Sequence, residues 1–195
     1  LSADQLRMEL PETILKDTGE LIDIIHRNCS RINQLVSELL NSTRFTELQI
    51  DKHSINELIE EALELAKDRI SLKKISVEKK FSYDICDIEV DAEKVKIAFL
   101  NLIVNAVEAM EPENGALTIS TAAKDKKCIV EITDNGTGIP TEHQDHLFEP
   151  YFTSKEKGTG LGLTNTQNII LSHKGSIRVK SEAGKGTTFI VSFAL

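Results

Sequence analysis

The chain has 195 residues, 40% of them hydrophobic and 28% charged, which is typical of a soluble globular protein. A net charge of −8 without a basic stripe argues against a nucleic-acid binder, and the absence of any bilayer-length apolar run predicts no membrane contact within this chain. The three cysteines form no CxxC pair, which argues against a zinc site or a disulfide framework and favours reduced thiols in the cytoplasm.

The first segment, residues 1–48, is predicted to be helical. Residues 1–10 resemble the end of one helix, Pro11 interrupts it, and residues 12–43 carry an apolar stripe at steps of three and four. Such a stripe suits a helical hairpin or a coiled-coil seam that pairs with a second chain. The alternative is a long helix that packs on its own domain. The absence of a matching long apolar helix later in the chain favours the intermolecular bundle.

Residues 49–195 predict an α+β domain. The capping box from Ser54 to Glu57 begins a helix that ends near Ser71, and Asp91 can cap a helix that ends near Met110. A third helix is predicted at about residues 163–172, and strands at residues 75–81, 88–90, 117–122, 128–133, 176–181 and 187–193. This order of elements predicts a two-layer α/β sandwich, with helices on one face of a mixed sheet.

Two asparagines interrupt the apolar helix NLIVNAVEAM, residues 101–110. Asn101, Asn105 and Glu108 lie at i, i+4 and i+7, so they share one face. A carboxamide in an apolar setting needs a partner, and a hard cation such as Mg²⁺ prefers oxygen ligands of this kind. The alternative is a pair of surface amides hydrogen-bonded to a loop.

A glycine-rich loop, DNGTGIP, begins at Asp134, directly after a predicted strand. The Asp134 carboxylate can accept a hydrogen bond from an exocyclic amine such as that of adenine, and Gly136 and Gly138 let another molecule approach the backbone. A calcium loop or a plain turn is the alternative. The spacing does not fit the EF-hand pattern, which argues against calcium.

A second glycine-rich loop, GTGLGL, begins a helix with Gly158, Gly160 and Gly162. Backbone N–H groups at the start of a helix form an anion site. The spacing matches neither the Walker A loop nor the Rossmann fingerprint, and a flexible turn is the alternative.

Between the two loops lies LFEPYFTSKEK, residues 147–157. Its aromatic residues can anchor a lid, and Lys155 or Lys157 can reach phosphates. A solvated charged loop is the alternative.

In this order and spacing, these segments resemble the catalytic ATP-binding domain (HATPase) of sensor histidine kinases, within the GHKL superfamily that includes DNA gyrase and a heat-shock chaperone. NLIVNAVEAM resembles the N box, DNGTGIP the G1 box, LFEPYFTSK the F box and GTGLGL the G2 box, and GKGTTF resembles the terminal GxGT motif. The resemblance covers residues 55–195 and implies the Bergerat α/β sandwich fold.

The resemblance also implies roles for individual residues, with ATP and Mg²⁺ as ligands. Asn105 would hold Mg²⁺, Asp134 would bind the adenine amine, and Thr187 would support Asp134 through a water molecule. Lys155 would contact a phosphate. The other residues implied for the pocket and lid are Asn101, Gly136, Gly138, Lys157, Gly158, Thr159, Gly160, Gly162 and Leu163.

Asn101 stands where hydrolytic members of the superfamily have a glutamate that activates water. An amide cannot take a proton at neutral pH, so this site is expected to hold ATP without fast hydrolysis. The implied activity is that of a protein-histidine kinase, a transferase that passes the γ-phosphoryl group to a histidine and then to a response-regulator aspartate in a phosphorelay. The alternatives are a GHKL-type ATPase, a serine kinase of the anti-sigma type and a non-catalytic nucleotide-binding dimerisation module.

None of the five histidines matches the phosphoacceptor motif, in which an acid and then a proline follow the histidine. His26, which is followed by Arg27 and Asn28, is the candidate for a substitute phosphoryl acceptor. Because the chain begins with Leu1 and not with methionine, we expect a fragment that lacks its phosphoacceptor and is unable to autophosphorylate alone. Residues 1–48 would be part of a dimerisation hairpin and residues 49–195 the catalytic domain. The full-length protein is expected to be a cytoplasmic homodimer or the cytoplasmic portion of a membrane-bound sensor, with a response-regulator receiver domain as partner.

Overall fold

The computed structural model describes residue 24 and residues 48–84, 87–155 and 158–195. The chain divides into two compact units, Leu1–Phe45 and Thr46–Leu195, and nearly all described residues belong to the second. The predicted helix of residues 12–43, His26 included, lies outside the described residues except at Ile24, which is helical. None of the helices in the described part is long and apolar enough to cross a membrane.

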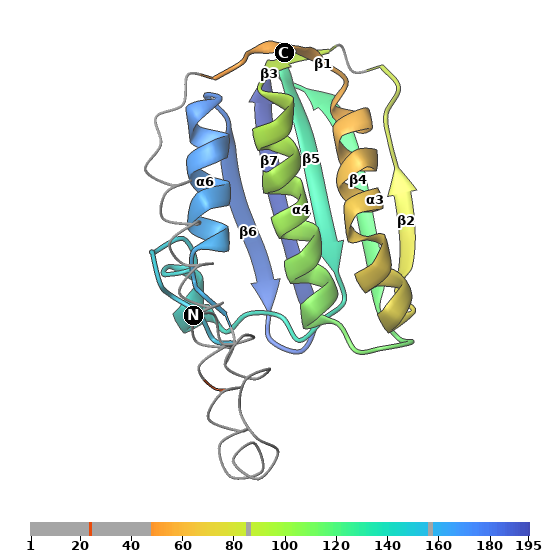
Figure 1. Cartoon of the computed structure of the whole chain (residues 1–195), viewed down its shortest axis with the longest axis vertical. Helices are drawn as coiled ribbons and strands as arrows, with labels where there is room; N and C mark the ends of the chain where they lie inside the picture. Colours follow the sequence, from red (N-terminus) through yellow and green to blue (C-terminus); the bar gives the residue numbers. More distant parts are fainter. Residues whose placement is uncertain (1–23, 25–47, 85–86, 156–157) are drawn as a thin grey trace, which may run out of the picture. The chain divides into compact units, whose positions relative to one another are not determined.

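A five-stranded mixed sheet, in the order β2-β4-β5-β7-β6, forms one layer of the second unit (Figure 1). β2 is parallel to β4, and the other neighbours are antiparallel. The hairpins β4–β5 and β6–β7 confirm the predicted strand pairs. The bounds are β2 Ser76–Lys80, β4 Ala116–Lys124, β5 Lys127–Asp134, β6 Ser176–Glu182 and β7 Gly186–Ala194.

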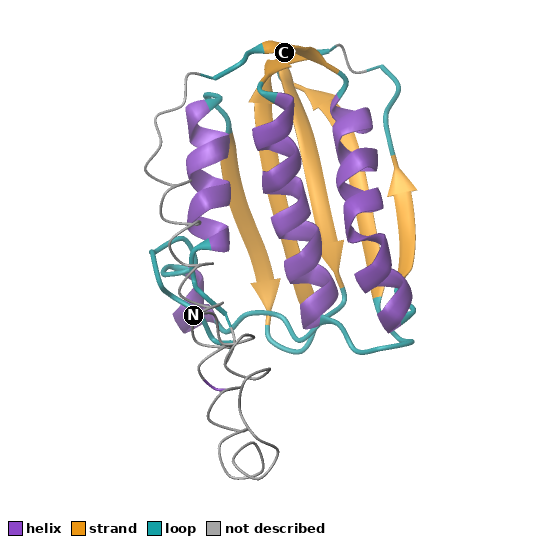
Figure 2. Ribbon diagram, viewed as in Figure 1, coloured by secondary structure: helices purple, strands orange, loops and turns teal. Residues whose placement is uncertain are grey.

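Three helices form the second layer and cover one face of the sheet (Figure 2), namely α3 (Ile55–Lys73), α4 (Ala92–Ala109) and α6 (Gly162–Ser172). Both predicted caps are present. Ser54 Oγ accepts the Glu57 N–H at 3.5 Å, and Asp91 Oδ1 accepts the Lys94 N–H at 3.1 Å. The predicted two-layer α+β sandwich is therefore confirmed.

Two short elements were not expected from the sequence. β1 (Asp51–His53) pairs antiparallel with β3 (Ile88–Val90) in a separate two-stranded sheet, and α5 (Thr141–Gln144) is a single helical turn. The side chains of β1 are polar and mostly exposed, so no alternation marks this strand. Its extended form depends on a partner far away in the sequence.

α4 lies between α3 and α6 and is the central helix of the core (Figure 1). The Phe99 side chain of α4 is fully buried and meets Phe193 of β7 edge-on, with ring centroids 6.5 Å apart. Burying a side chain of this size contributes about 2–3 kcal/mol. The other buried residues of α4 are Val95, Ala98, Leu102, Ile103, Ala106 and Val107. Asn101 and Asn105 are not among them, so they lie beside the core and not within it.

His173, at the end of α6, is a buried structural link to the start of α4. Its Nε2 accepts the Asp91 N–H at 2.9 Å, and its Nδ1 lies 2.7 Å from Ile169 O. A carbonyl only accepts, so Nδ1 carries the proton and donates it. Both ring nitrogens are therefore occupied, and His173 has no free nitrogen for a phosphoryl group.

Replacing His173 with alanine is expected to lower the free energy of unfolding by about 1–3 kcal/mol, because the buried Asp91 N–H loses its acceptor. Urea unfolding measures the change. His146→Ala is the control, since its ring is half exposed and contacts the neighbouring Glu149, and we expect it to change stability much less. Equal losses in both variants would contradict the linking role of His173.

Candidate functional site

The helix-facing side of the sheet changes from apolar to polar at one end of three neighbouring strands. Along β5, β7 and β6 the inward positions are apolar except at this end, where Asp134, Thr187 and Ser181 stand. The register pairs Asp134 with Thr187 and Thr187 with Ser181. The three side chains therefore form one line across the sheet, which we call the polar row.

Asp134 is the buried acid of the polar row, with 4% of its surface exposed. Its Oδ1 accepts the Gly136 N–H at 2.8 Å, and the Thr187 backbone N–H also donates to the carboxylate. Burial raises the pKa of the Asp134 carboxyl, while these two hydrogen bonds and the charge of Lys155 oppose the rise. In the described part of the chain no cationic side chain forms an ion pair with it, so the carboxylate keeps acceptor capacity for a ligand.

The loop of residues 135–140 is tied to two neighbouring parts of the fold. Thr137 N donates to Ala109 O, at the end of α4, at 3.1 Å. Gly184 N, in the turn between β6 and β7, donates to Thr137 O at 2.7 Å. The backbone of Thr137 thus fixes the loop between a helix end and a hairpin turn.

The two glycines of this loop are required by the chain's own backbone. A Cβ at Gly136 would lie 2.6 Å from Ala109 O. At Gly138, whose φ is +65°, a Cβ would lie 2.0 Å from Glu182 O. These approaches explain both glycines by steric contact within the chain. The approach of another molecule, which the sequence suggested, stays a prediction.

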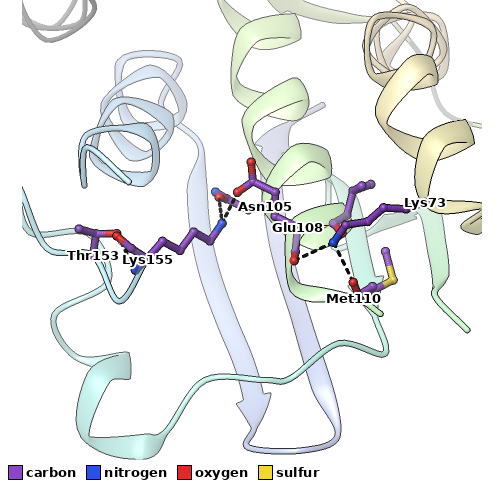
Figure 3. A network of polar contacts seen from close by, with 7 residues as sticks. Lys73, Asn105, Glu108, Met110, Thr153 and Lys155 are labelled. Atoms are coloured by element: carbon purple, nitrogen blue, oxygen red, sulfur yellow. Dashed lines mark hydrogen bonds and ion pairs between the residues drawn. The ribbon is translucent and has the colours of Figure 1, made fainter. Parts of the chain in front are cut away.

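Lys73, the last residue of α3, caps the end of α4 (Figure 3). Its Nζ donates to the carbonyl oxygens of Val107, Glu108 and Met110 at 3.0, 3.1 and 2.9 Å. α4 has no basic residue in its own last turn, so the neighbouring helix satisfies these carbonyl groups. The cap fixes the helix end to which the loop of residues 135–140 is tied.

Asn105 and Glu108 of α4 converge on one cation, the Lys155 ammonium group (Figure 3). Lys155 Nζ donates to Asn105 Oδ1 at 3.0 Å and to Glu108 Oε2 at 2.6 Å. The predicted shared face of these two residues is thus present, and Asn101 lies one turn earlier and is half-buried. The contact also fits the alternative of a helix amide bonded to a loop. The same contact is compatible with a hard cation, because Asn105 Oδ1 and Glu108 Oε2 already bind a positive charge.

Aromatic contacts anchor the segment between α5 and α6. Leu147 is buried and Phe148 packs against the core. Phe152 meets the rings of His143 and His146, with centroids 5.5 and 5.9 Å apart. Phe148 and Phe152 therefore anchor this segment as predicted, whereas Tyr151 is largely exposed.

The second glycine-rich loop ends at the start of α6. A Cβ at Gly160, whose φ is +70°, would lie 2.4 Å from the Tyr151 carbonyl carbon, and one at Gly158 would lie 2.3 Å from Thr153 Oγ1. Gly162 begins α6, and no side chain caps that helix, so its first N–H groups can serve an anion. The remaining predicted residues are Thr159, whose Oγ1 accepts the Leu161 N–H at 3.4 Å, Leu163, which packs against the core, and Lys157, which lies outside the described residues.

The structure thus brings three predicted parts of the site together. Asp134 and Thr187 offer acceptors beside the end of α4. Asn105 holds Lys155, and the charge of Lys155 acts on Asp134. This arrangement suits a ligand that has hydrogen-bond donors at one end and anionic, cation-binding groups at the other. Lys73 and Ser181 were not anticipated from the sequence.

Comparison with known proteins gives the family. The profile of the family described as "Histidine kinase-, DNA gyrase B-, and HSP90-like ATPase" matches residues 90–195, which include α4, the polar row and both glycine-rich loops. Sporulation kinase C of Bacillus subtilis is 35% identical over 189 residues, which cover 96% of this chain and 44% of that protein. This chain therefore spans less than half of that relative's length.

Solved structures agree with the family match. The catalytic domain of histidine kinase ThkA is 31% identical, with a TM-score of 0.68 over 75% of this chain and 95% of that chain. Histidine kinase ThkA in complex with response regulator protein TrrA is 29% identical, with a TM-score of 0.74 over 95% of this chain and 52% of that chain. This chain belongs to the family of histidine kinase-, DNA gyrase B- and HSP90-like ATPases, and its described part has the fold of a histidine-kinase catalytic domain.

Proposed function

We propose that residues 49–195 are the ATP-binding catalytic domain of a sensor histidine kinase and that residues 1–48 belong to its dimerisation hairpin. The domain binds ATP and transfers the γ-phosphoryl group to a histidine, for relay to an aspartate of a response-regulator receiver domain. The likeness to proteins named sporulation kinase C and histidine kinase ThkA supports this proposal over the ATPase alternative.

The observation that carries the proposal is the environment of Asp134. It is a buried carboxylate whose hydrogen bonds, among the described residues, come only from backbone N–H groups. Burying a charge without an ion-pair partner costs stability, which a binding role explains. The free acceptor capacity of Asp134 suits the exocyclic amine of adenine, with Thr187 beside it.

Asn105 is the proposed ligand of Mg²⁺. The contact of Asn105 and Glu108 with the Lys155 ammonium group supports this, since the same oxygens suit a small hard cation. Bound there with the phosphates, Mg²⁺ would neutralise charge during phosphoryl transfer. Lys155 would then contact a phosphate, and the uncapped start of α6 supports a further phosphate contact. The pocket and lid also include Asn101, Gly136, Gly138, Lys157, Gly158, Thr159, Gly160, Gly162 and Leu163.

The transfer needs a nucleophile other than water. The unprotonated imidazole nitrogen forms a bond to the γ-phosphorus, the bond from that phosphorus to the bridging oxygen breaks, and ADP leaves with the electron pair. The proton on the other imidazole nitrogen passes to solvent. Asn101 cannot take a proton from water at neutral pH, which supports slow hydrolysis in the absence of the histidine.

The full-length protein is proposed to act in the cytoplasm as a homodimer through its helical hairpin. The apolar stripe of residues 12–43 supports the dimer. The structure of histidine kinase ThkA with a response regulator supports the choice of partner.

A calorimetric titration of this chain with ATP, with and without Mg²⁺, followed by a phosphate-release assay, tests the proposal. We expect binding that strengthens with Mg²⁺ and little release of phosphate. Steady release would favour the ATPase alternative. An absence of ATP binding would overturn the proposal.

A further inference from the structure

We propose that Ser181 is a positioning residue for base recognition, because it fixes the direction of the Thr187 hydroxyl group. It thereby leaves Asp134 and Thr187 of the polar row as hydrogen-bond acceptors for a ligand. This inference rests on the proposed function, in which the polar row meets the purine base of ATP.

The hydroxyl of Ser181 has a complete set of partners. Ile139 N donates to Ser181 Oγ at 2.8 Å, and Ser181 Oγ donates to Gly186 O at 2.9 Å. Thr187 Oγ1 lies 2.9 Å from the same oxygen. A hydroxyl group has one proton and two acceptor lone pairs, so three contacts fill it.

The direction of each bond follows from counting protons. A carbonyl only accepts, so the Ser181 proton goes to Gly186 O, and the Ile139 N–H takes one lone pair of Ser181. The remaining lone pair must receive the Thr187 proton. The Thr187 hydroxyl therefore has no proton left for a ligand, and towards the site it can only accept.

Neighbouring contacts hold this arrangement in place. Gln144 Nε2 donates to Ile139 O and to Ser181 O, both at 2.9 Å, so one side chain clamps both backbones. Gly186 has a φ of +108°, and a Cβ there would lie 2.0 Å from Asp134 O. Ser181 is half-buried, which limits competition from water.

Two acceptors side by side select the chemistry of the base. When ionised, Asp134 only accepts, and Thr187 only accepts because of Ser181. A 6-amino purine, directly or through a water molecule, brings the donors that these groups need. A 6-oxo purine brings an acceptor oxygen, which leaves buried acceptors facing each other. Ser181 is thus expected to contribute to the preference for adenine.

The test compares ATP with inosine triphosphate, which carries an oxygen in place of the 6-amino group. In Ser181→Ala the Thr187 proton is released and can donate to that oxygen. We expect the dissociation constant of inosine triphosphate, divided by that of ATP, to fall about tenfold, which is the equivalent of one hydrogen bond. Ser181→Cys fills the site with a slightly larger sulfur that is only a weak donor and acceptor, so it should lower the same ratio without leaving a cavity.

Ser176→Ala is the matched control. Ser176 lies on the same strand, and its Oγ is 2.9 Å from Ser192 Oγ on β7, but at the end of the strands away from the polar row. This variant also loses a hydroxyl pair between β6 and β7, and it should keep the parent's ratio.

If the Ser181 variants weaken the binding of ATP and inosine triphosphate equally, Ser181 serves loop packing only, and the inference is overturned. It is also overturned if the variants change neither affinity. In either case ATP binding by the parent would leave the proposed function standing. A parent that binds neither nucleotide would overturn the proposed function and this inference together.

Discussion

Replacing Asp134 with asparagine is expected to weaken ATP binding about a hundredfold while leaving the fold intact. An ionised carboxylate offers only acceptors, whereas an amide places N–H donors in the same buried position, opposite the adenine amine. Opposing one buried donor with another costs about 3 kcal/mol, which corresponds to about a hundredfold weaker binding. Calorimetry with Mg-ATP measures the loss, and thermal unfolding without nucleotide checks the fold.

Glu131→Gln is the matched control for this prediction. Glu131 lies on the same strand, three residues before Asp134, and this spacing places it on the opposite face of the sheet. The chemical change is the same, from a carboxylate to an amide, and we expect ATP affinity to remain that of the parent. Unchanged affinity in Asp134→Asn would contradict the assignment of Asp134 to base recognition.

The pH dependence of the parent gives a second measurement on the same carboxyl. Burial raises the pKa of Asp134, so the folded state keeps this proton to higher pH than the unfolded chain does. ATP affinity should therefore rise with pH as Asp134 ionises. Stability without nucleotide should fall as pH rises through the window between the unfolded and the raised folded pKa, and Asp134→Asn should lack that fall. Urea denaturation at a pH below and a pH above this window measures whether stability falls as expected.

Local signals in the sequence were sufficient for most of the fold, and long-range contacts account for what was missed. The caps at Ser54 and Asp91 act over three residues, so they locate the starts of α3 and α4 correctly. Lys73 caps α4 from 34 to 37 residues away, and no pattern near Lys73 announces this. β1 likewise depends on pairing with β3.

The candidate site shows the same division between local and long-range information. Motifs singled out Asn105, Lys155, Asp134 and Thr187, and the structure brings Asn105 to Lys155 and Asp134 to Thr187. Ser181 belongs to no such motif. A signal was nevertheless present, because the inward positions of β6 turn polar at the same end as those of its hairpin partner β7. Aligning the predicted strands in register would have found it.

Replacing Asn105 with alanine is expected to make ATP binding nearly independent of Mg²⁺. Asn105 Oδ1 is the proposed protein ligand, and without it the ion loses the amide oxygen that would hold it beside the phosphates. We expect the ratio of the ATP dissociation constants without and with Mg²⁺ to fall at least about tenfold. Calorimetry under both conditions measures this ratio. Asn168→Ala, at an exposed position of α6, is the control and should keep the parent's ratio.

Lys155 makes this test specific for metal ligation. In the structure its ammonium group is shared between Asn105 and Glu108, so a Mg²⁺ ion bound as proposed would have to displace it from the Asn105 oxygen. Asn105→Ala releases one of these contacts, and metal-free ATP affinity should therefore be kept or increased, because Lys155 is freer to meet a phosphate. Equal weakening with and without Mg²⁺ would instead mean that the amide only supports the shape of the site. Equal affinities under the two conditions in the parent would contradict a metal role for Asn105 altogether.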